Sequence, residues 1–180
     1  MSKEAFIPCL FGVFRQYGYD GATLSKISEA TGLGKASLYH HFPGGKDAMV
    51  KSVLNYADDW VEKNVLQPLA SNGSEFERLQ TMCDRINDLY GEGTQPCLLA
   101  ILQVGTGREA FHPQIKAALD KWIGAIATVL VESGMDETLA RQRGEHAIIL
   151  IQGSLMASQG LDDPSLFQRV IKALPQQIIS

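Results

Sequence analysis

Apolar residues recur at three- and four-residue intervals from one end of this 180-residue chain to the other, and no segment shows the sustained polar/apolar alternation of a strand. Phe6, Leu10 and Phe14 illustrate this spacing near the N-terminus. We therefore expect an all-α protein. A chain of this length can bury a core without disulfide or metal cross-links. Its composition, 45% hydrophobic and 20% charged, is close to the globular average and excludes a wholly disordered or fibrous chain.

Turn and capping residues divide the N-terminal part into three short helices. The first is expected to end at Tyr17-Gly18. Thr23 can cap the second helix by accepting a hydrogen bond from an unpaired first-turn amide, and Gly32 ends it. A third helix over residues 35–41 must end before Pro43, whose ring disfavours helical geometry at the preceding residue.

A long helix is expected from about residue 46 to about residue 65, followed by a main loop formed by Pro68 and residues 71–73. Ser74 and Glu77 have the spacing of a capping box, so the next helix opens there. Further breaks between helices are expected at residues 91–96, 105–107, 133–134 and 160–164.

The segment Thr23–Phe42, TLSKISEATGLGKASLYHHF, has the pattern of a helix-turn-helix. Ile27, Leu33 and Leu38 would form its small shared core. The outer face of its second helix would then present a short polar strip suited to the major groove of DNA, formed by Lys35, Ala36, Ser37, Tyr39 and His40. A connector within a larger helical bundle is the alternative interpretation.

The net charge of −4 is unevenly distributed along the chain. Residues 1–51 carry six basic and four acidic side chains, a net charge of +2, whereas the other 129 residues carry −6. A locally positive end can still meet phosphates, because charges beyond a Debye length of about 8 Å are largely screened at physiological salt. The three cysteines are far apart, and the chain has neither a signal-like leader nor an apolar run of membrane-spanning length. These features predict a cytoplasmic protein that does not enter a membrane.

The segment GYDGATLSKISEATGLGKASLYHHFPGGKDAMV, residues 18–50, strongly resembles the N-terminal domain of the TetR family of bacterial transcriptional regulators. Its HHFPGGK motif is similar to that of a branch that includes repressors of multidrug-efflux genes. The resemblance implies a helix-turn-helix DNA-binding domain over residues 1–50 and a helical ligand-binding and dimerisation domain over residues 51–180. It also implies a homodimeric regulator, a repressor that a small molecule releases from double-stranded operator DNA.

Individual roles follow from the matched positions. Tyr39 and His40 would lie mainly at phosphates, Thr23 would hold a phosphate at the start of its helix, and Lys46 would grip the DNA backbone. Gly34 departs from the family, which usually has Ser or Thr there to cap the recognition helix. The DNA-binding residues implied by the resemblance and by the polar strip are Thr23, Gly34, Lys35, Ala36, Ser37, Tyr39, His40 and Lys46.

The resemblance further implies that the fifth to seventh helices enclose a ligand pocket. Apolar residues on these helices favour an apolar or lipophilic cationic effector, although each of them also suits a core position. The expected pocket residues are Met82, Ile86, Leu89, Leu102, Phe111, Trp122, Ile126 and Met156.

The last two long helices are expected to pair with a second subunit. Residues 147–151 are apolar all round, and a closing helix, capped by Asp163 with Pro164 in its first turn, carries an apolar stripe. The stripe is also compatible with closing the core of one subunit. The expected interface residues are Ile148, Ile151, Leu155, Phe167, Val170, Ile171 and Leu174.

The sequence contains no Gly-rich phosphate loop, GxSxG, HExxH or paired CxxC motif, so we expect no catalytic residue, metal or cofactor. Two alternatives remain open. One is an α-helical enzyme or adaptor with an incidental helix-turn-helix. The other is a regulator that senses oxidants through Cys97, because a thiol at a helix N-terminus can have a lowered pKa. Buried packing is the favoured interpretation of Cys97.

Overall fold

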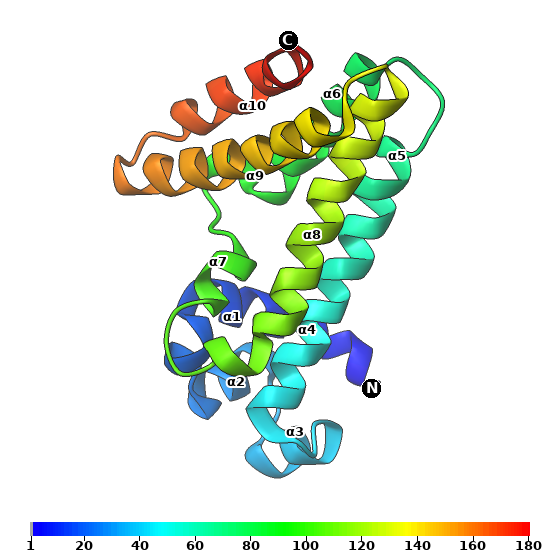
Figure 1. Ribbon diagram of the computed structural model, residues 1–180. Helices are drawn as coiled ribbons and strands as arrows, with labels where there is room; N and C mark the ends of the chain where they lie inside the picture. The colour runs from blue at the N-terminus through cyan, green and yellow to red at the C-terminus, as the bar shows by residue number, and fades with distance from the viewer. Residues whose placement is uncertain (1) are drawn as a thin grey trace. The chain divides into compact units, whose positions relative to one another are not determined.

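The computed structural model describes residues 2–180, and all regular secondary structure in that range is helical (Figure 1). The all-α prediction is confirmed. The described residues form two compact units. The first contains the residues up to Asp59 together with Leu98–Ile115, and the second contains Trp60–Cys97 and Lys116–Ser180. The first unit therefore includes a segment from the half of the chain in which the ligand-binding domain was expected.

The first unit is built from helices around a core that includes the fully buried side chains of Phe14, Ile27, Leu38 and Phe42. Its N-terminal helices are η1 (Lys3–Phe6), α1 (Ile7–Gly21), α2 (Leu24–Thr31), α3 (Lys35–His41) and most of α4 (Gly45–Val61). The segment 98–115 adds α7 (Leu98–Leu102) and the first two turns of α8 (Arg108–Glu132), and α7 packs against α1.

The predicted end of α2 is confirmed, and a break is present at Gly18 as predicted, although α1 continues to Gly21. Gly18 has a non-helical backbone, with φ 66° and ψ −172°, and only one further turn follows before Gly21. Thr23 caps α2 because its hydroxyl oxygen accepts a hydrogen bond from the Lys26 amide at 3.3 Å. Gly32 ends α2 in the left-handed conformation, with φ 70°, which glycine adopts without steric cost.

Helix α4 does not end near residue 65 as expected. It continues through a π-helical turn, η2 (Glu62–Leu66), into α5 (Gln67–Leu69), so Pro68 lies in a helix and not in the main loop. Proline has no amide hydrogen and clashes with the carbonyl four residues earlier in a regular α-helix. The wider π-turn directly before Pro68 relieves this conflict, and there the Gln67 amide bonds to the carbonyl of Glu62.

The second unit packs the C-terminal helix between two others. It contains η2, α5, α6 (Glu75–Leu89), η3 (Gly91–Gly93), the rest of α8, α9 (Glu137–Gly160) and α10 (Pro164–Ile179). Helix α10 lies along α9 and also contacts α6 (Figure 1). Phe167 of α10 is fully buried, and its amide donates to the buried Ser158 hydroxyl of α9 at 2.8 Å.

Two predicted helix starts in this unit are confirmed. Ser74 and Glu77 form a reciprocal capping box at α6. Asp163 caps α10 by accepting from the Ser165 amide at 3.0 Å, and Pro164 occupies the first turn. Across residues 2–180, no helix combines the length and apolar character needed to cross a membrane.

Candidate nucleic-acid interface

The turn between α2 and α3 is fixed by hydrogen bonds from two small polar side chains. Ser28 Oγ donates to the carbonyl of Leu33 at 2.5 Å. Thr31 Oγ1 donates to the carbonyl of Ile27 at 2.7 Å and accepts from the Leu33 amide at 3.3 Å. With Ile27 and Leu38 fully buried beneath the turn, α2 and α3 form a helix-turn-helix that is held by both packing and polar contacts.

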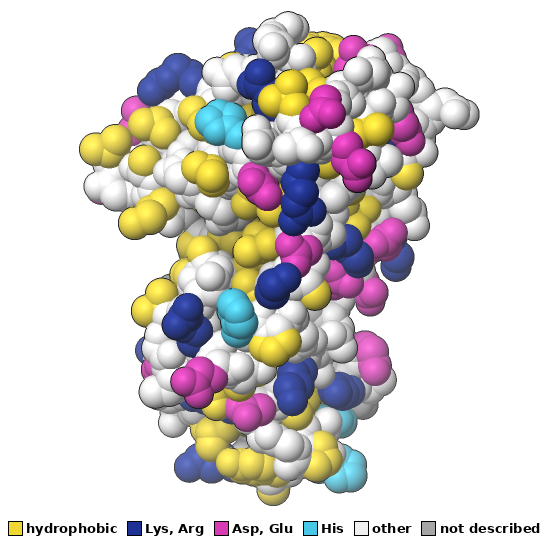
Figure 2. Space-filling view, viewed as in Figure 1, with side chains coloured by type: hydrophobic (Ala, Val, Ile, Leu, Met, Phe, Trp, Pro, Cys, Tyr) yellow, Lys and Arg dark blue, Asp and Glu magenta, His cyan; other side chains and the backbone are white. Residues whose placement is uncertain are grey.

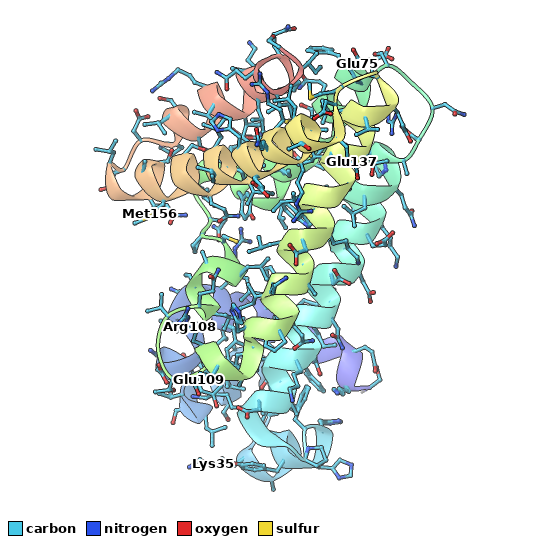
Figure 3. All side chains as sticks on the ribbon, viewed as in Figure 1. Lys35, Glu75, Arg108, Glu109, Glu137 and Met156 are labelled. Carbon is cyan, nitrogen blue, oxygen red and sulfur yellow. The ribbon has the colours of Figure 1, made fainter. Side chains whose placement is uncertain are left out.

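Helix α3 presents one exposed face. Leu38 points inward, whereas five residues of the predicted polar strip are exposed: Lys35, Ala36, Ser37, Tyr39 and His40. Tyr39 is 48% exposed, so it is not a core aromatic. His41 is half-buried, with its ring 5.2 Å from that of Phe6. Figure 3 shows Lys35 at the start of α3, directed away from the ribbon.

Gly34 precedes α3 in an extended conformation, with φ −68° and ψ 161°, and provides no side-chain cap. A Cβ atom at this position would meet nothing within 4 Å. The first amides of α3 therefore lack the side-chain acceptor that a Ser or Thr would supply, and a phosphate oxygen can bond to them instead. Thr23, at the start of α2, is likewise exposed.

Lys46, in the first turn of α4, is held over an aromatic ring. Its Nζ lies 4.2 Å from the ring centroid of Tyr19, and the Tyr19 hydroxyl donates to Asp47 Oδ1 at 2.5 Å. The hydrogen bond to Asp47, assisted by burial and by the acidic charges of Asp47 and Asp20, raises the pKa of Tyr19 to about 12. Tyr19 therefore remains a hydrogen-bond donor throughout the physiological pH range.

Sequence reasoning missed the role of Tyr19, Asp20 and Asp47. The signal available was the Tyr19-Asp20 pair directly after the break at Gly18. Their partners, however, lie 28 residues away for Tyr19 and 86 for Asp20. Helical periodicity reports which face of a helix is buried and carries no information about such distant pairings.

The expected ligand-pocket residues are divided between the two units. Leu102 and Phe111 belong to the first unit, and Phe111 packs against Tyr19 with their ring centroids 5.4 Å apart. The second unit holds the others, of which four are buried on α6 and α8: Met82, Ile86, Trp122 and Ile126. Leu89 is half-buried. Met156 is 78% exposed on the outer side of α9, so it does not line an interior pocket (Figure 3).

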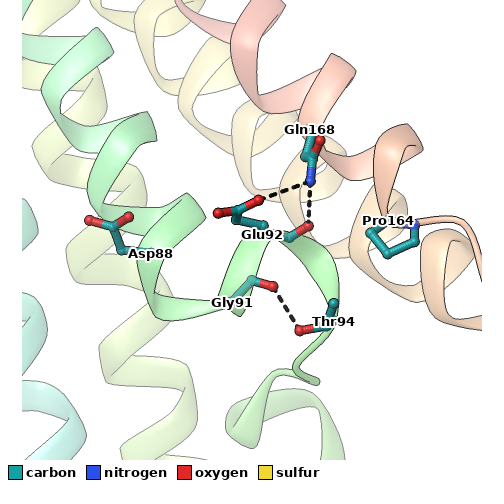
Figure 4. A pocket seen from close by; sticks show the side chains of 6 residues that line it. All are labelled: Asp88, Gly91, Glu92, Thr94, Pro164 and Gln168. Carbon is teal, nitrogen blue, oxygen red and sulfur yellow. Dashed lines mark hydrogen bonds between the residues drawn. The ribbon is translucent and has the colours of Figure 1, made fainter.

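A shallow pocket of about 460 Å³ lies on the second unit and is lined by none of the expected residues. Figure 4 shows its polar wall, where the Gln168 amide donates to the carbonyl of Glu92 at 3.2 Å. Its lining residues are Asp88, Gly91, Glu92, Thr94, Pro164 and Gln168. Asp88 and Glu92 give this lining two carboxylates, and it contains no aromatic side chain.

Most of the expected interface residues are buried inside the second unit itself. Ile151, Phe167 and Leu174 are completely buried, and Ile148, Leu155 and Ile171 retain less than a tenth of their surface. Val170 is half-buried. The stripe on α10 therefore closes the core against α9 and α6 and leaves little surface for a partner. The outer side of α9 instead exposes Ile149, Met156 and, just beyond its end, Leu161, and Figure 2 shows hydrophobic side chains on this part of the surface.

Two of the three cysteines, Cys83 and Cys97, are buried. Cys97 is buried and its Sγ accepts a hydrogen bond from the Tyr90 hydroxyl at 3.4 Å. Burial raises the pKa of Cys83 to about 12, which keeps it a thiol. Within the described part of the chain, no group of three or more His, Cys, Asp or Glu side chains is arranged to hold a metal ion.

Comparison with known proteins agrees with this architecture. Residues 11–53 match the family described as bacterial regulatory proteins, tetR family, and residues 76–173 match the LmrA/YxaF-like transcriptional regulator C-terminal domain. The HTH-type transcriptional regulator LmrA of Bacillus subtilis is 25% identical over 165 residues, which cover 87% of this chain and 86% of LmrA.

A second relative matches a shorter segment at higher identity. The negative transcriptional regulator IcaR of the Staphylococcus epidermidis biofilm operon is 37% identical over 65 residues, 34% of this chain and 35% of IcaR. The crystal structure of a TetR transcriptional regulator from Legionella pneumophila has the same fold, with a TM-score of 0.84 at 22% identity, covering 98% of this chain and 97% of that one. The chain belongs to the TetR family of bacterial helix-turn-helix transcriptional regulators, and its C-terminal part is of the LmrA/YxaF-like type.

Proposed function

We propose that this regulator is a homodimeric repressor that binds operator DNA through α3 and the first turn of α4. In this proposal, a small apolar or lipophilic cationic molecule bound to the second unit releases the DNA. The single observation that carries the proposal is the exposed face of α3, in which all five residues of the polar strip are accessible while Leu38 anchors the helix in the core. The name of IcaR, a negative regulator, favours repression. As a DNA-binding regulator it would act in the cytoplasm, where the bacterial chromosome lies.

The decisive experiment is selection of duplexes from random-sequence DNA by the purified wild-type chain. We expect a recovered sequence with two related half-sites centred about 34–36 Å apart, because a dimer places its two recognition helices in successive major grooves. Fusion of that sequence to a reporter promoter should lower expression when the regulator is present. Recovery of no preferred sequence would contradict the proposal.

Lys35→Ala and Lys46→Ala should each weaken binding to the selected duplex and to unrelated duplexes alike. Each lysine is expected to neutralise one phosphate, so each substitution should lower the slope of log affinity against log salt by about one. Fluorescence anisotropy at a series of salt concentrations measures both quantities. Lys172→Ala, an exposed lysine of α10, is the matched control and should leave the slope unchanged. Wild-type slopes in both test variants would refute the proposed docking.

An effector must bind the DNA-free form more tightly, because a ligand shifts an equilibrium only through its different affinities for the two states. We expect a compound found by screening lipophilic cations and neutral apolar molecules to bind the free protein more tightly than the DNA-bound protein. By thermodynamic reciprocity, the ratio should equal the factor by which the compound weakens DNA binding. Trp122 is buried in the second unit and provides a fluorescence signal. Equal affinity for both forms would exclude that compound as an inducer.

The dimer surface is proposed on the outer side of α9. Ile149 and Met156 are seven residues apart, so they lie on one side of the helix, and Gly153 between them would give a partner close access because nothing lies within 4 Å of its Cβ position. We propose it in place of the residues expected from sequence because six of those seven are buried within the second unit. TetR-family regulators act as dimers, and a single helix-turn-helix reads too few base pairs for useful specificity.

A further inference from the structure

The Asp20 carboxylate, at the end of α1, binds one distant residue through two hydrogen bonds. Its Oδ2 accepts from the Thr106 amide at 2.9 Å, and its Oδ1 accepts from the Thr106 hydroxyl. Both residues belong to the first unit although they are 86 positions apart in the sequence. Both bonds stabilise the ionised carboxylate and so lower the pKa of Asp20. The pair therefore remains intact at neutral pH.

The chain before α8 lies directly on this part of α1. A Cβ at Gly105 would stand 2.1 Å from Asp20 Oδ2, and Gly105 also has φ 85°, a backbone conformation that other residues rarely adopt. A Cβ at Gly107 would stand 2.7 Å from Cγ of Tyr19. Two glycines thus permit a contact so close that no larger residue fits at either position. The backbone of residues 105–107 therefore packs directly against Tyr19 and Asp20.

Tyr19 extends the contact to the start of α4. Its ring packs against Phe111 of α8. Its hydroxyl donates a hydrogen bond to Asp47, and the Lys46 ammonium lies over the ring. Asp20 also contributes an attractive charge to Lys46. The Tyr19-Asp20 pair therefore connects the first turn of α8 with the first turn of α4, where the proposed phosphate contact of Lys46 is made.

We infer that Asp20 is a positioning residue for DNA binding: by holding Thr106 it keeps Tyr19 seated between α8 and α4, and Tyr19 in turn keeps Lys46 in place beside α3. The inference rests on the proposed function, because it assigns a purpose to the position of Lys46. Neither Asp20 nor Thr106 belongs to the DNA-binding residues themselves.

Thr106→Val tests the inference without changing any charge. It removes the hydroxyl donor and keeps the amide, the β-branched shape and every proposed DNA contact. If positioning depends on this bond, Thr106→Val should lower the affinity for the selected duplex by about threefold to tenfold, which is the net contribution of one hydrogen bond. Thr106→Ser restores the hydroxyl and should bind as the wild type does.

Asp20→Asn makes the test sharper, because electrostatics and positioning predict opposite results. Removing a negative charge beside Lys46 should by itself tighten binding to polyanionic DNA. The bonds between residue 20 and Thr106 also lose their charged acceptor, and this weaker contact should weaken DNA binding. We expect weaker binding, and we expect the Asp20→Asn, Thr106→Val double variant to lose less than the sum of the two single losses, since both remove the same interaction.

The second unit contains a chemically matched control pair. Asp163 Oδ1 accepts from the Ser165 amide at 3.0 Å and from the Ser165 hydroxyl at 2.6 Å, so a carboxylate again holds an amide and a hydroxyl of one residue, here at the start of α10. Ser165→Ala should reduce thermal stability about as much as Thr106→Val and leave DNA affinity unchanged. Equal DNA losses in the two variants would indicate a general effect of stability and would overturn the inference.

Amide exchange separates this inference from the proposed function. In Thr106→Val, the amides of residues 105–111 should exchange faster than in the wild type, whether or not DNA is present. Faster exchange with unchanged affinity would mean that the contact is structural only, and the positioning role would be wrong. If the wild-type chain selects no DNA sequence, both the proposed function and the positioning role are wrong. The exchange rates of residues 105–111 would still show whether the Asp20–Thr106 contact holds this segment in place.

Discussion

A variant carrying both Ile149→Glu and Met156→Glu should be a folded monomer whose affinity for the selected duplex is lower by about a hundredfold or more. Both side chains are mostly exposed on α9, at 65% and 78%, and glutamate is a good helix former, so the subunit itself should lose little stability. In a partner interface, however, four carboxylates would be brought together without counter-ions. Loss of the second half-site removes the gain from two linked contacts, which is about 10²- to 10⁴-fold.

Light scattering and anisotropy measure the two parts of this result. The variant with Gln at both positions is the matched control, because it introduces polarity without charge and should dimerise more weakly than the wild type but better than the glutamate variant. Helicity by circular dichroism should match the wild type in both. A glutamate variant that remains dimeric at micromolar concentration would place the interface elsewhere.

Phe167→Ala should strongly lower the free energy of unfolding of this chain. The side chain is completely buried, its ring lies edge-on to Tyr90 with the centroids 5.9 Å apart, and Gly93 would have no room for a Cβ beside it. Truncation of a buried phenylalanine costs about 3–5 kcal/mol because a cavity remains. For a protein of this size, that loss lowers the midpoint of thermal unfolding by about 10 °C.

Phe76→Ala provides the control for this measurement. Phe76 is 44% exposed in the first turn of α6, so its removal should change stability by about 1 kcal/mol or less. Calorimetric unfolding of the two variants compares them directly. A similar midpoint for Phe167→Ala and Phe76→Ala would contradict the assignment of Phe167 to the core, and would return it to the list of candidate partner contacts.

Local features of the fold were predictable because their causes lie within a few residues. The caps at Thr23 and Ser74 depend on side chains that bond to backbone groups three positions away, and α2 ends at Gly32 because this glycine itself adopts the left-handed conformation. The exposed strip of α3 was predictable for the same reason, since the burial of Leu38 fixes the direction of its helical neighbours.

Features that depend on distant packing were not predictable. The apolar stripe of α10 suits a partner subunit and a monomer core equally well, and only the positions of α9 and α6 decide that Phe167 faces inward. The 78% exposure of Met156 was not predictable either, because an apolar side chain on an apolar helix does not indicate which side of the helix is covered. The continuation of α4 past residue 65 depends on the π-turn before Pro68, for which the sequence has no established signal.

The first unit combines two separate segments of the chain, and this limits how its DNA specificity can be transferred to another protein. Residues 98–115 follow α1 in the sequence only after α2 to η3, yet they cover the end of α1: Ile101 lies against Gly18, and Phe111 against Tyr19. A fragment that stops at residue 50 would expose both surfaces to water. A chimaera made by cutting there would join a recognition domain to a foreign version of residues 98–115. Transplanting the DNA specificity of this chain therefore requires two segments, and the Gly105–Gly107 loop must travel with Tyr19 and Asp20.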